Sequence, residues 1–235
     1  MLLQGQVQIL TAGYTPGALI GWNGAIPLAT VIVWMKEGMM MNKKTKYLVT
    51  VSLASALAMI LLLFRVSLPF LPPFYKLDFS ESVVLLAGYL LDAKATIIIQ
   101  LLKNILKIVI SSSNTAFVGD LANFIMGVSF VFPAVAIYKR KETKTSMLLG
   151  LVVGVISLTI TSCLVNYYIM LPAYGVMFNM PIDAIVAIGN KLNSNITNLF
   201  TFVMFATAPF NIIKGTSSAV IAALIWKNIK VLTKK

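Results

Sequence analysis

Long runs of apolar residues, separated by short polar or proline-rich stretches, make up most of the chain. The runs cover Tyr47–Phe64, Val83–Leu91, Ala95–Ile110, Phe117–Tyr138, Ser146–Met170 and Leu199–Trp226. A helix needs about 20 mostly apolar residues to cross a bilayer, and most of these runs approach that length. They also differ from the roughly ten-residue alternating segments of a membrane β-barrel. The pattern predicts an all-α, polytopic membrane protein with six transmembrane helices.

The run at 83–110 is compatible with one long helix or with two helices joined at Asp92–Lys94. Basic side chains gather at 43–46 and at 139–144, and such clusters accumulate in the cytoplasmic loops of membrane proteins. If 83–110 crosses the membrane once, these two clusters lie on opposite sides. If it crosses twice, both lie in the cytoplasm. We therefore predict two crossings, a cytoplasmic turn at Asp92–Lys94, and cytoplasmic N and C termini.

The first 40 residues differ from the rest of the chain. Glycine, asparagine and proline interrupt their one hydrophobic segment, and three methionines at 39–41 precede the basic stretch at 43–46. Many bacterial membrane proteins begin with such a basic stretch. We therefore expect residues 1–40 to be a non-native start or a disordered or interfacial extension, with an additional span as the alternative. Residues 41–235 then form a single six-helix membrane domain.

The composition supports the membrane interpretation and excludes several functions. Of the 235 residues, 59% are apolar and 11% are charged, against about 25% charged residues in a soluble domain. We attribute the net charge of +12 to topology and expect a bacterial cell-membrane protein without a nucleic-acid partner. The sequence has no histidine and one cysteine, Cys163, which excludes catalytic triads, histidine metal sites and an intrachain disulfide. It also has no P-loop, so a driving ATPase must be another subunit.

The segment 208–215 carries the most informative polar side chains. Asn211 and Lys214 are three residues apart and share a helix face, and Pro209 can kink the helix beside them. An amide that donates and accepts, together with a fixed ammonium donor, suits a ligand site. The alternative is a kinked helix whose lysine reaches the membrane interface.

Three further segments contribute candidate ligand-binding residues. Segment 166–179 contributes Asn166, Tyr174 and Asn179. The start of the fourth run contributes Asn123, which lies near Asp120 in the sequence. The aromatic, proline-rich loop 68–80 contributes Tyr75, Asp78 and Phe79. An interfacial aromatic belt is the alternative for the tyrosines, and a helix N-terminal position is the alternative for Asp120. In the predicted topology all of these lie on the outer side. Together they predict a pocket for a flat heteroaromatic ligand with a polyol tail, and they include no nucleophile–base pair, so we expect no enzyme.

Two other features have more than one explanation. Lys103 and Lys107 share a helix face, where they either line a polar interior, pair with Asp120, or pack against a neighbouring helix with their amines at the interface. Ala54 and Ala58, four residues apart, allow close approach of another helix. That helix belongs either to a partner subunit or to this chain.

Four of these segments, in order and at their spacings, resemble the riboflavin-binding S components of energy-coupling-factor (ECF) vitamin transporters over residues 44–230. They are 68–80, 121–141, 166–175 and 209–215. The resemblance implies a six-helix subunit that captures riboflavin near the outer face as transported ligand, without a cofactor. It also implies association with a transmembrane coupling protein and two cytoplasmic ATPases. Ala54 and Ala58 would then dock the coupling protein.

Within the matched segments, the resemblance suggests polar contacts from Asn211, Lys214, Asn166 and Asn179, and ring or wall contacts from Phe79, Tyr75 and Tyr174. Two alternatives remain at this point. One is an S component for another vitamin, such as thiamine or biotin. The other is a stand-alone secondary transporter, for which Asp120 or the Lys103–Lys107 pair would have to form the ion path.

Overall fold

A computed structural model of the chain describes residues 42–72, 74–111, 117–177 and 179–232. The chain divides into two units, Met1–Lys46 and Tyr47–Lys235, and the prediction about residues 1–40 lies outside the described residues. The described part is almost entirely helical. Its helices are α3 (Lys43–Leu63), α4 (Ser80–Leu90), α5 (Ala93–Ser111), α6 (Val118–Lys141), α7 (Lys144–Val165), α8 (Leu171–Met177), α9 (Ile182–Leu192), α10 (Leu199–Phe202) and α11 (Ala208–Leu232).

Within the described residues, four helical segments are long and apolar enough to cross a membrane. They are Lys43–Leu63, Val118–Lys141, Lys144–Met177 and Leu199–Asn228. The helix α4 is apolar but shorter, and α5 has sufficient length but carries Lys94, Lys103 and Lys107. The helical class is therefore confirmed, together with four candidate spans.

The predicted break in the run 83–110 is confirmed. The helix α4 ends at Leu90 and α5 begins at Ala93. The backbone N–H of Ala95 donates to Asp92 Oδ1 at 2.8 Å, so the Asp92 carboxylate caps the start of α5. The short polar turn thus forms because its aspartate satisfies a helix N-terminus.

The predicted span Ser146–Met170 corresponds to a longer helical segment in the structure. A π-helical turn, η2 (Asn166–Met170), joins α7 to α8 and carries the helix on to Met177. A second π-helical turn, η3 (Val203–Thr207), joins α10 to α11. Each turn lies just before a proline, Pro172 or Pro209. Because a proline clashes with the carbonyl four residues earlier, a locally widened turn lets the helix continue past it.

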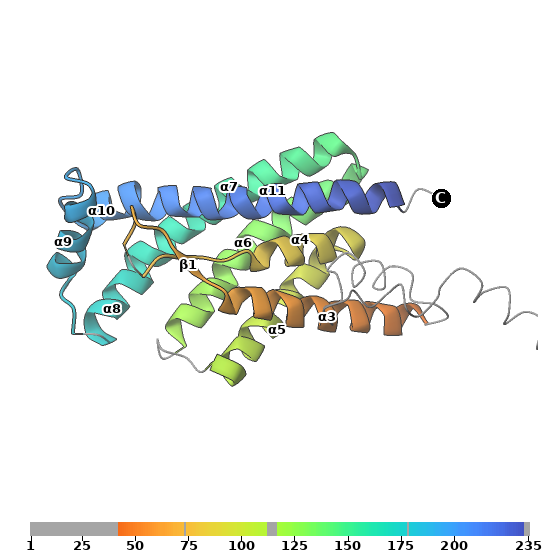
Figure 1. The fold of residues 1–235 in the computed structure, drawn as a ribbon, viewed down its shortest axis with the longest axis horizontal. Helices are drawn as coiled ribbons and strands as arrows, with labels where there is room; N and C mark the ends of the chain where they lie inside the picture. The colour runs from red at the N-terminus through yellow and green to blue at the C-terminus, as the bar shows by residue number, and fades with distance from the viewer. Residues whose placement is uncertain (1–41, 73, 112–116, 178, 233–235) are drawn as a thin grey trace, which may run out of the picture. The chain divides into compact units, whose positions relative to one another are not determined.

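The helices of the unit Tyr47–Lys235 pack as an antiparallel bundle (Figure 1). The helix α6 lies along α7 and α5, and α11 lies along α7 and α4. The approach of α6 and α7 depends on glycine: a Cβ atom at Gly150 would lie 2.4 Å from the carbonyl oxygen of Ala134, and one at Gly154 would lie 2.6 Å from that of Phe130. The helices α8, α9 and α10 gather at one end of the bundle (Figure 1).

The loop between α3 and α4 folds back as a small ribbon at this same end. Its strands β1 (Val66–Ser67) and β2 (Lys76–Leu77) pair antiparallel, with Val66 opposite Leu77. Leu71, Tyr75 and Leu77 of the loop belong to a buried cluster with residues of α9, α10, η3 and α11. Burial of these apolar side chains holds the loop against the bundle. It also brings the polar residues of the loop close to the interior of the bundle.

Candidate ligand-binding site

A cavity of about 310 Å³ lies between this loop and α3, α5, α6, η2, α8 and α11. Most of the predicted ligand-binding residues line it: Tyr75, Asp78, Asn123, Asn166, Tyr174, Asn211 and Lys214. They come from four sequence segments that the fold brings together. The cavity is the natural candidate for the binding site because it joins aromatic walls to a few convergent polar groups.

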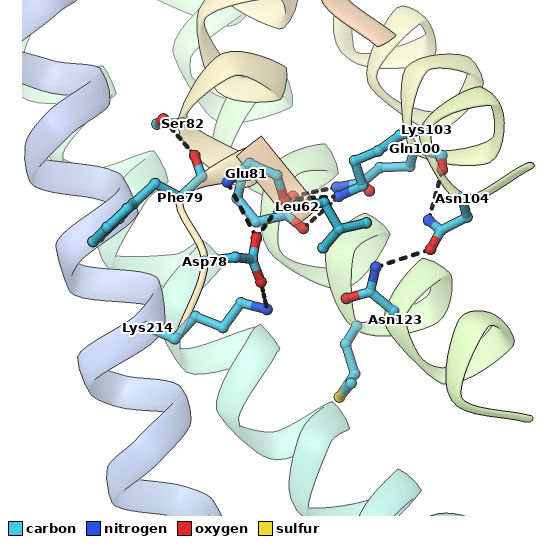
Figure 2. A network of polar contacts seen from close by, with 12 residues as sticks. Leu62, Asp78, Phe79, Glu81, Ser82, Gln100, Lys103, Asn104, Asn123 and Lys214 are labelled. Atoms are coloured by element: carbon cyan, nitrogen blue, oxygen red, sulfur yellow. Dashed lines mark hydrogen bonds and ion pairs between the residues drawn. The ribbon is translucent and has the colours of Figure 1, made fainter. Parts of the chain in front are cut away.

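Asp78 and Lys214 form an ion pair on one wall of the cavity (Figure 2). Lys214 Nζ donates to Asp78 Oδ2 at 2.8 Å, and the two side chains are 11% and 2% exposed. The other carboxylate oxygen, Oδ1, accepts from the Ser80 backbone N–H at 3.1 Å and from the Ser80 hydroxyl at 2.5 Å. Burial opposes ionisation of Asp78, but the ammonium groups of Lys214 and Lys103 and these hydrogen bonds outweigh it and lower the pKa to about 2.

Tyr75 fixes the loop to the two π-helical turns. Its hydroxyl lies 2.5 Å from Thr207 Oγ1 in η3 and donates to Asn166 Oδ1 in η2 at 3.4 Å. Its ring stacks on Phe210, with 4.9 Å between centroids and an interplanar angle of 16°. Burial raises the pKa of Tyr75 and outweighs the opposing effect of the Thr207 hydrogen bond, so the phenol stays protonated and can donate.

The side chains of Asn166 and Asn211 are each held by the backbone carbonyl four residues earlier in the chain. Asn166 Nδ2 donates to the Ser162 carbonyl at 2.8 Å, and Asn211 Nδ2 donates to the Thr207 carbonyl at 2.9 Å. The Oδ1 atom of Asn211 accepts no hydrogen bond from the described residues. Because Asn211 lines the cavity, its fixed amide presents an acceptor to a ligand there.

The opposite wall is a polar seam between α5 and α6. Lys107 Nζ lies 2.8 Å from Asp120 Oδ1, and Asn123 Nδ2 donates to Asn104 Oδ1 at 2.9 Å. Of the alternatives for the two lysines, pairing with Asp120 therefore holds for Lys107. Lys103 instead pairs with Glu81 at 2.8 Å and is fully buried.

Two predicted ligand residues lie outside the lining of this cavity. Asn179 is exposed and adopts a left-handed backbone conformation with φ 47° after α8 ends. Phe79 precedes α4 and packs half-buried against the apolar cluster of the loop. For the proposed docking pair, Ala54 and Ala58 are both completely buried on α3. Burial alone does not distinguish the two alternatives for this pair, and its docking role stays a prediction.

The cavity is also lined by residues that the sequence pattern did not indicate. The principal ones are Arg65, Phe74, Lys76, Met126, Met170 and Phe210. Arg65, Phe74 and Lys76 belong to the aromatic, proline-rich loop or flank it, so their position in that segment was the available signal. The two methionines gave no signal, because they lie on apolar helices like any packing residue.

The fold and the cavity describe a helical protein with four candidate membrane spans among the described residues and a partly polar, partly open cavity. A family model described as the substrate-specific component of ECF transporters matches residues 46–226. The chain belongs to this family of transporter S components, which are not enzymes.

Named relatives support the assignment. The chain is 36% identical to riboflavin transporter RibU of Staphylococcus aureus over 85% of this chain and 97% of the relative. It is 32% identical to riboflavin transporter FmnP of Bacillus subtilis over 80% of this chain and 93% of the relative. A solved S component of a bacterial ECF transporter superposes with a TM-score of 0.65 at 33% identity, covering 82% of this chain and all of that one.

Proposed function

We propose that this S component captures riboflavin in the cavity beneath the α3–α4 loop and delivers it for uptake by an ECF transporter. The observation that carries the proposal is the convergence of Tyr75, Asn166, Asn211 and Lys214 on one aromatic-walled cavity. The relatives named as riboflavin transporters favour riboflavin over thiamine and biotin. Riboflavin offers a flat ring with hydrogen-bonding edges and a polyol tail, and so matches this mixture of rings, amides and ammonium.

The polar groups have distinct roles in this proposal. Asn211 Oδ1, which accepts no hydrogen bond from the described residues, accepts from a ring N–H of the ligand. The Lys214 ammonium donates to Asp78 alone among the described residues, so it has two further N–H bonds for carbonyl groups. Asn123 and the Lys107–Asp120 pair face the ligand from the opposite wall. Tyr75, Phe210 and Tyr174 form the apolar walls. Asn179 and Phe79 would reach the ligand only if their segments moved toward the cavity.

For the membrane arrangement, we propose six crossings with both termini in the cytoplasm of a bacterial cell. The crossings are α3, α4, α5, α6, α7 with α8, and α10 with α11. The helix α4 has 11 residues and is only about 16 Å long, so the folded-back loop would complete its layer. Lys103 and Lys107 of α5 are tolerated because Glu81 and Asp120 pair with them inside the bundle.

The topology is testable with an impermeant thiol reagent. In a Cys163→Ser background, we expect Asn193→Cys, between α9 and α10, to label in intact cells. We expect Glu142→Cys, between α6 and α7, to label only after permeabilisation. Labelling of both positions in intact cells would contradict the arrangement.

The partners proposed for this chain are a transmembrane coupling protein and two cytoplasmic ATPases. The absence of a P-loop in the sequence and the family assignment support this dependence on other subunits. Docking through Ala54 and Ala58 would require a partner to displace whatever covers them, because both are fully buried here.

The binding proposal is tested by titrating the purified, ligand-free protein with riboflavin and following flavin fluorescence. We expect saturable quenching that excess thiamine or biotin does not reverse. Quenching that thiamine or biotin abolishes would assign a different vitamin. Absence of quenching in a folded protein would overturn the riboflavin proposal.

A further inference from the structure

A chain of buried polar contacts continues from the cavity wall into the bundle beneath it (Figure 2). Lys214 contacts Asp78 Oδ2, and the Ser80 hydroxyl donates to Asp78 Oδ1 at 2.5 Å. Lys103 Nζ in turn donates to Ser80 Oγ at 3.3 Å and to Glu81 Oε1 at 2.8 Å. The contacts therefore run from α11 through the loop and α4 to α5, without a break.

The deep half of this chain does not touch the cavity. Ser80, Glu81 and Lys103 are 0%, 3% and 0% exposed, and none of them lines the cavity. Gln100 Nε2 also donates to Glu81 Oε2, so the Glu81 carboxylate is bound at both oxygens. Buried charges of this kind are costly and persist where they are fully paired.

Ser80 gives the contacts a defined direction. Its oxygen accepts from the Lys103 ammonium, so its one proton is committed to Asp78 Oδ1. Because Oδ1 is thus occupied, Oδ2 is the oxygen left for Lys214. The Lys103 ammonium thereby sets the rotation of the Ser80 hydroxyl. That hydroxyl orients the Asp78 carboxylate, and the carboxylate in turn holds the Lys214 ammonium at the cavity.

We propose that Lys103, acting through Ser80 and Asp78, is a positioning residue for the ligand site. The inference rests on the proposed function, since it assigns Lys103 an effect on riboflavin that it never contacts. A purely structural role is the competing explanation, in which Lys103 only neutralises Glu81. The two explanations differ in one respect: positioning requires the Ser80 hydroxyl and the Asp78 carboxylate, and neutralisation of Glu81 requires neither.

Ser80→Ala is the sharpest variant because it cuts the chain without leaving a buried charge unpaired. Ser82→Ala is its matched control. Ser82 is also buried on α4, but its hydroxyl donates to the Phe79 carbonyl at 2.6 Å, outside the chain. Lys103→Met removes the cation itself, with Lys94→Met at the exposed start of α5 as control. Each substitution is also made in an Asp78→Asn background.

The measurements are the Kd for riboflavin, the absorption spectrum of the bound flavin and the melting temperature. We expect Ser80→Ala and Lys103→Met each to weaken binding by about tenfold and to change the bound-flavin spectrum, the size of coupling seen for residues in one network. In the Asp78→Asn background the further loss should be below about twofold, since the connection is already broken. Ser82→Ala and Lys94→Met should leave Kd and spectrum unchanged.

Two results would overturn the inference while leaving the proposed function intact. One is a wild-type Kd and spectrum in Ser80→Ala, whatever happens to the melting temperature. The other is an equal loss of affinity with and without Asp78, which would show that Lys103 and Ser80 act on the fold as a whole. A wild-type Kd and spectrum in Ser80→Ala overturns the inference even if Lys103→Met fails to fold. If the folded wild-type protein binds no riboflavin, the proposed function falls, and this inference falls with it.

Discussion

Lys214 Nζ lies 2.8 Å from Asp78 Oδ2, although the two residues are 136 positions apart in the chain. The contact joins α11 to the loop that precedes α4, at the wall of the cavity. It places a cation at the wall of the cavity that we propose as the ligand site, while the carboxylate keeps that cation compensated in a largely buried setting. The same contact therefore serves both the closure of the loop on the bundle and the chemistry of the site.

Removal of the Lys214 ammonium should weaken riboflavin binding. Hydrogen bonds to charged groups contribute about 1.5–3 kcal/mol, so we expect Lys214→Met to raise Kd by roughly 10- to 100-fold. Lys214→Met combined with Asp78→Asn avoids an unpaired buried carboxylate and should lose affinity to a similar extent. Lys191→Met, an exposed lysine on α9, serves as the control. Fluorescence titration of the four proteins checks this, and an unchanged Kd in both Lys214 variants would remove that side chain from the site.

Two asparagines selected from the sequence should now behave differently. Asn211 lines the cavity and its Oδ1 accepts no hydrogen bond from the described residues, whereas Asn179 is exposed outside the lining. We expect Asn211→Ala to weaken riboflavin binding about tenfold, the effect of losing roughly one good hydrogen bond. Asn179→Gly, which suits the positive φ there, should leave Kd unchanged. The opposite ranking of the two variants in the titration would contradict the assigned cavity.

The contribution of Asp78 to stability should depend on pH only under acid conditions. Its pKa is lowered from 3.8 to about 2 in the folded protein. A carboxyl with a lowered pKa stabilises the fold above its unfolded value and loses this contribution as the pH falls through its folded value. We therefore expect no change from this group between about pH 5 and 8, and a falling melting temperature between about pH 4 and 2. Asp78→Asn should fall less steeply in that acid range, and an identical slope in both proteins would refute the assignment.

The sequence predicted those parts of the fold that depend on local pattern. Apolar runs located the helices, and the Asp92–Lys94 stretch located the break that Asp92 caps. Helical spacing also placed Asn211 and Lys214 on one face, and both line the cavity. These features were accessible because each is decided within a few residues of the chain.

Features that depend on packing were not accessible in this way. The partner of Lys103 is Glu81 on a different helix, and no spacing rule links the two. The π-helical turn η2 carries the helix past Pro172, and Asn179 beyond α8 has a left-handed φ of 47° and lies exposed, outside the lining of the cavity. Small residues at Ala54 and Ala58 indicated a close approach, but only the structure shows that both are completely buried.

The packing of α6 on α7 should be intolerant of a single methyl group. A Cβ atom at Gly150 would lie 2.4 Å from the carbonyl oxygen of Ala134, a backbone atom that cannot rotate away. Overpacking typically costs about 1–3 kcal/mol, so Gly150→Ala should lower the melting temperature in detergent. Gly175→Ala is the matched control, because its Cβ would meet its nearest neighbour at 3.4 Å, an ordinary contact. Equal melting temperatures for the two variants would contradict the close helix approach.

Capture of riboflavin by this S component is tested by the visible absorption spectrum of the protein purified in detergent. We expect a flavin spectrum whose chromophore, released by denaturation, is riboflavin. We also expect Lys214→Met to purify with less flavin than the Lys191→Met control. A folded protein that is colourless and does not quench the fluorescence of added riboflavin would contradict the claim.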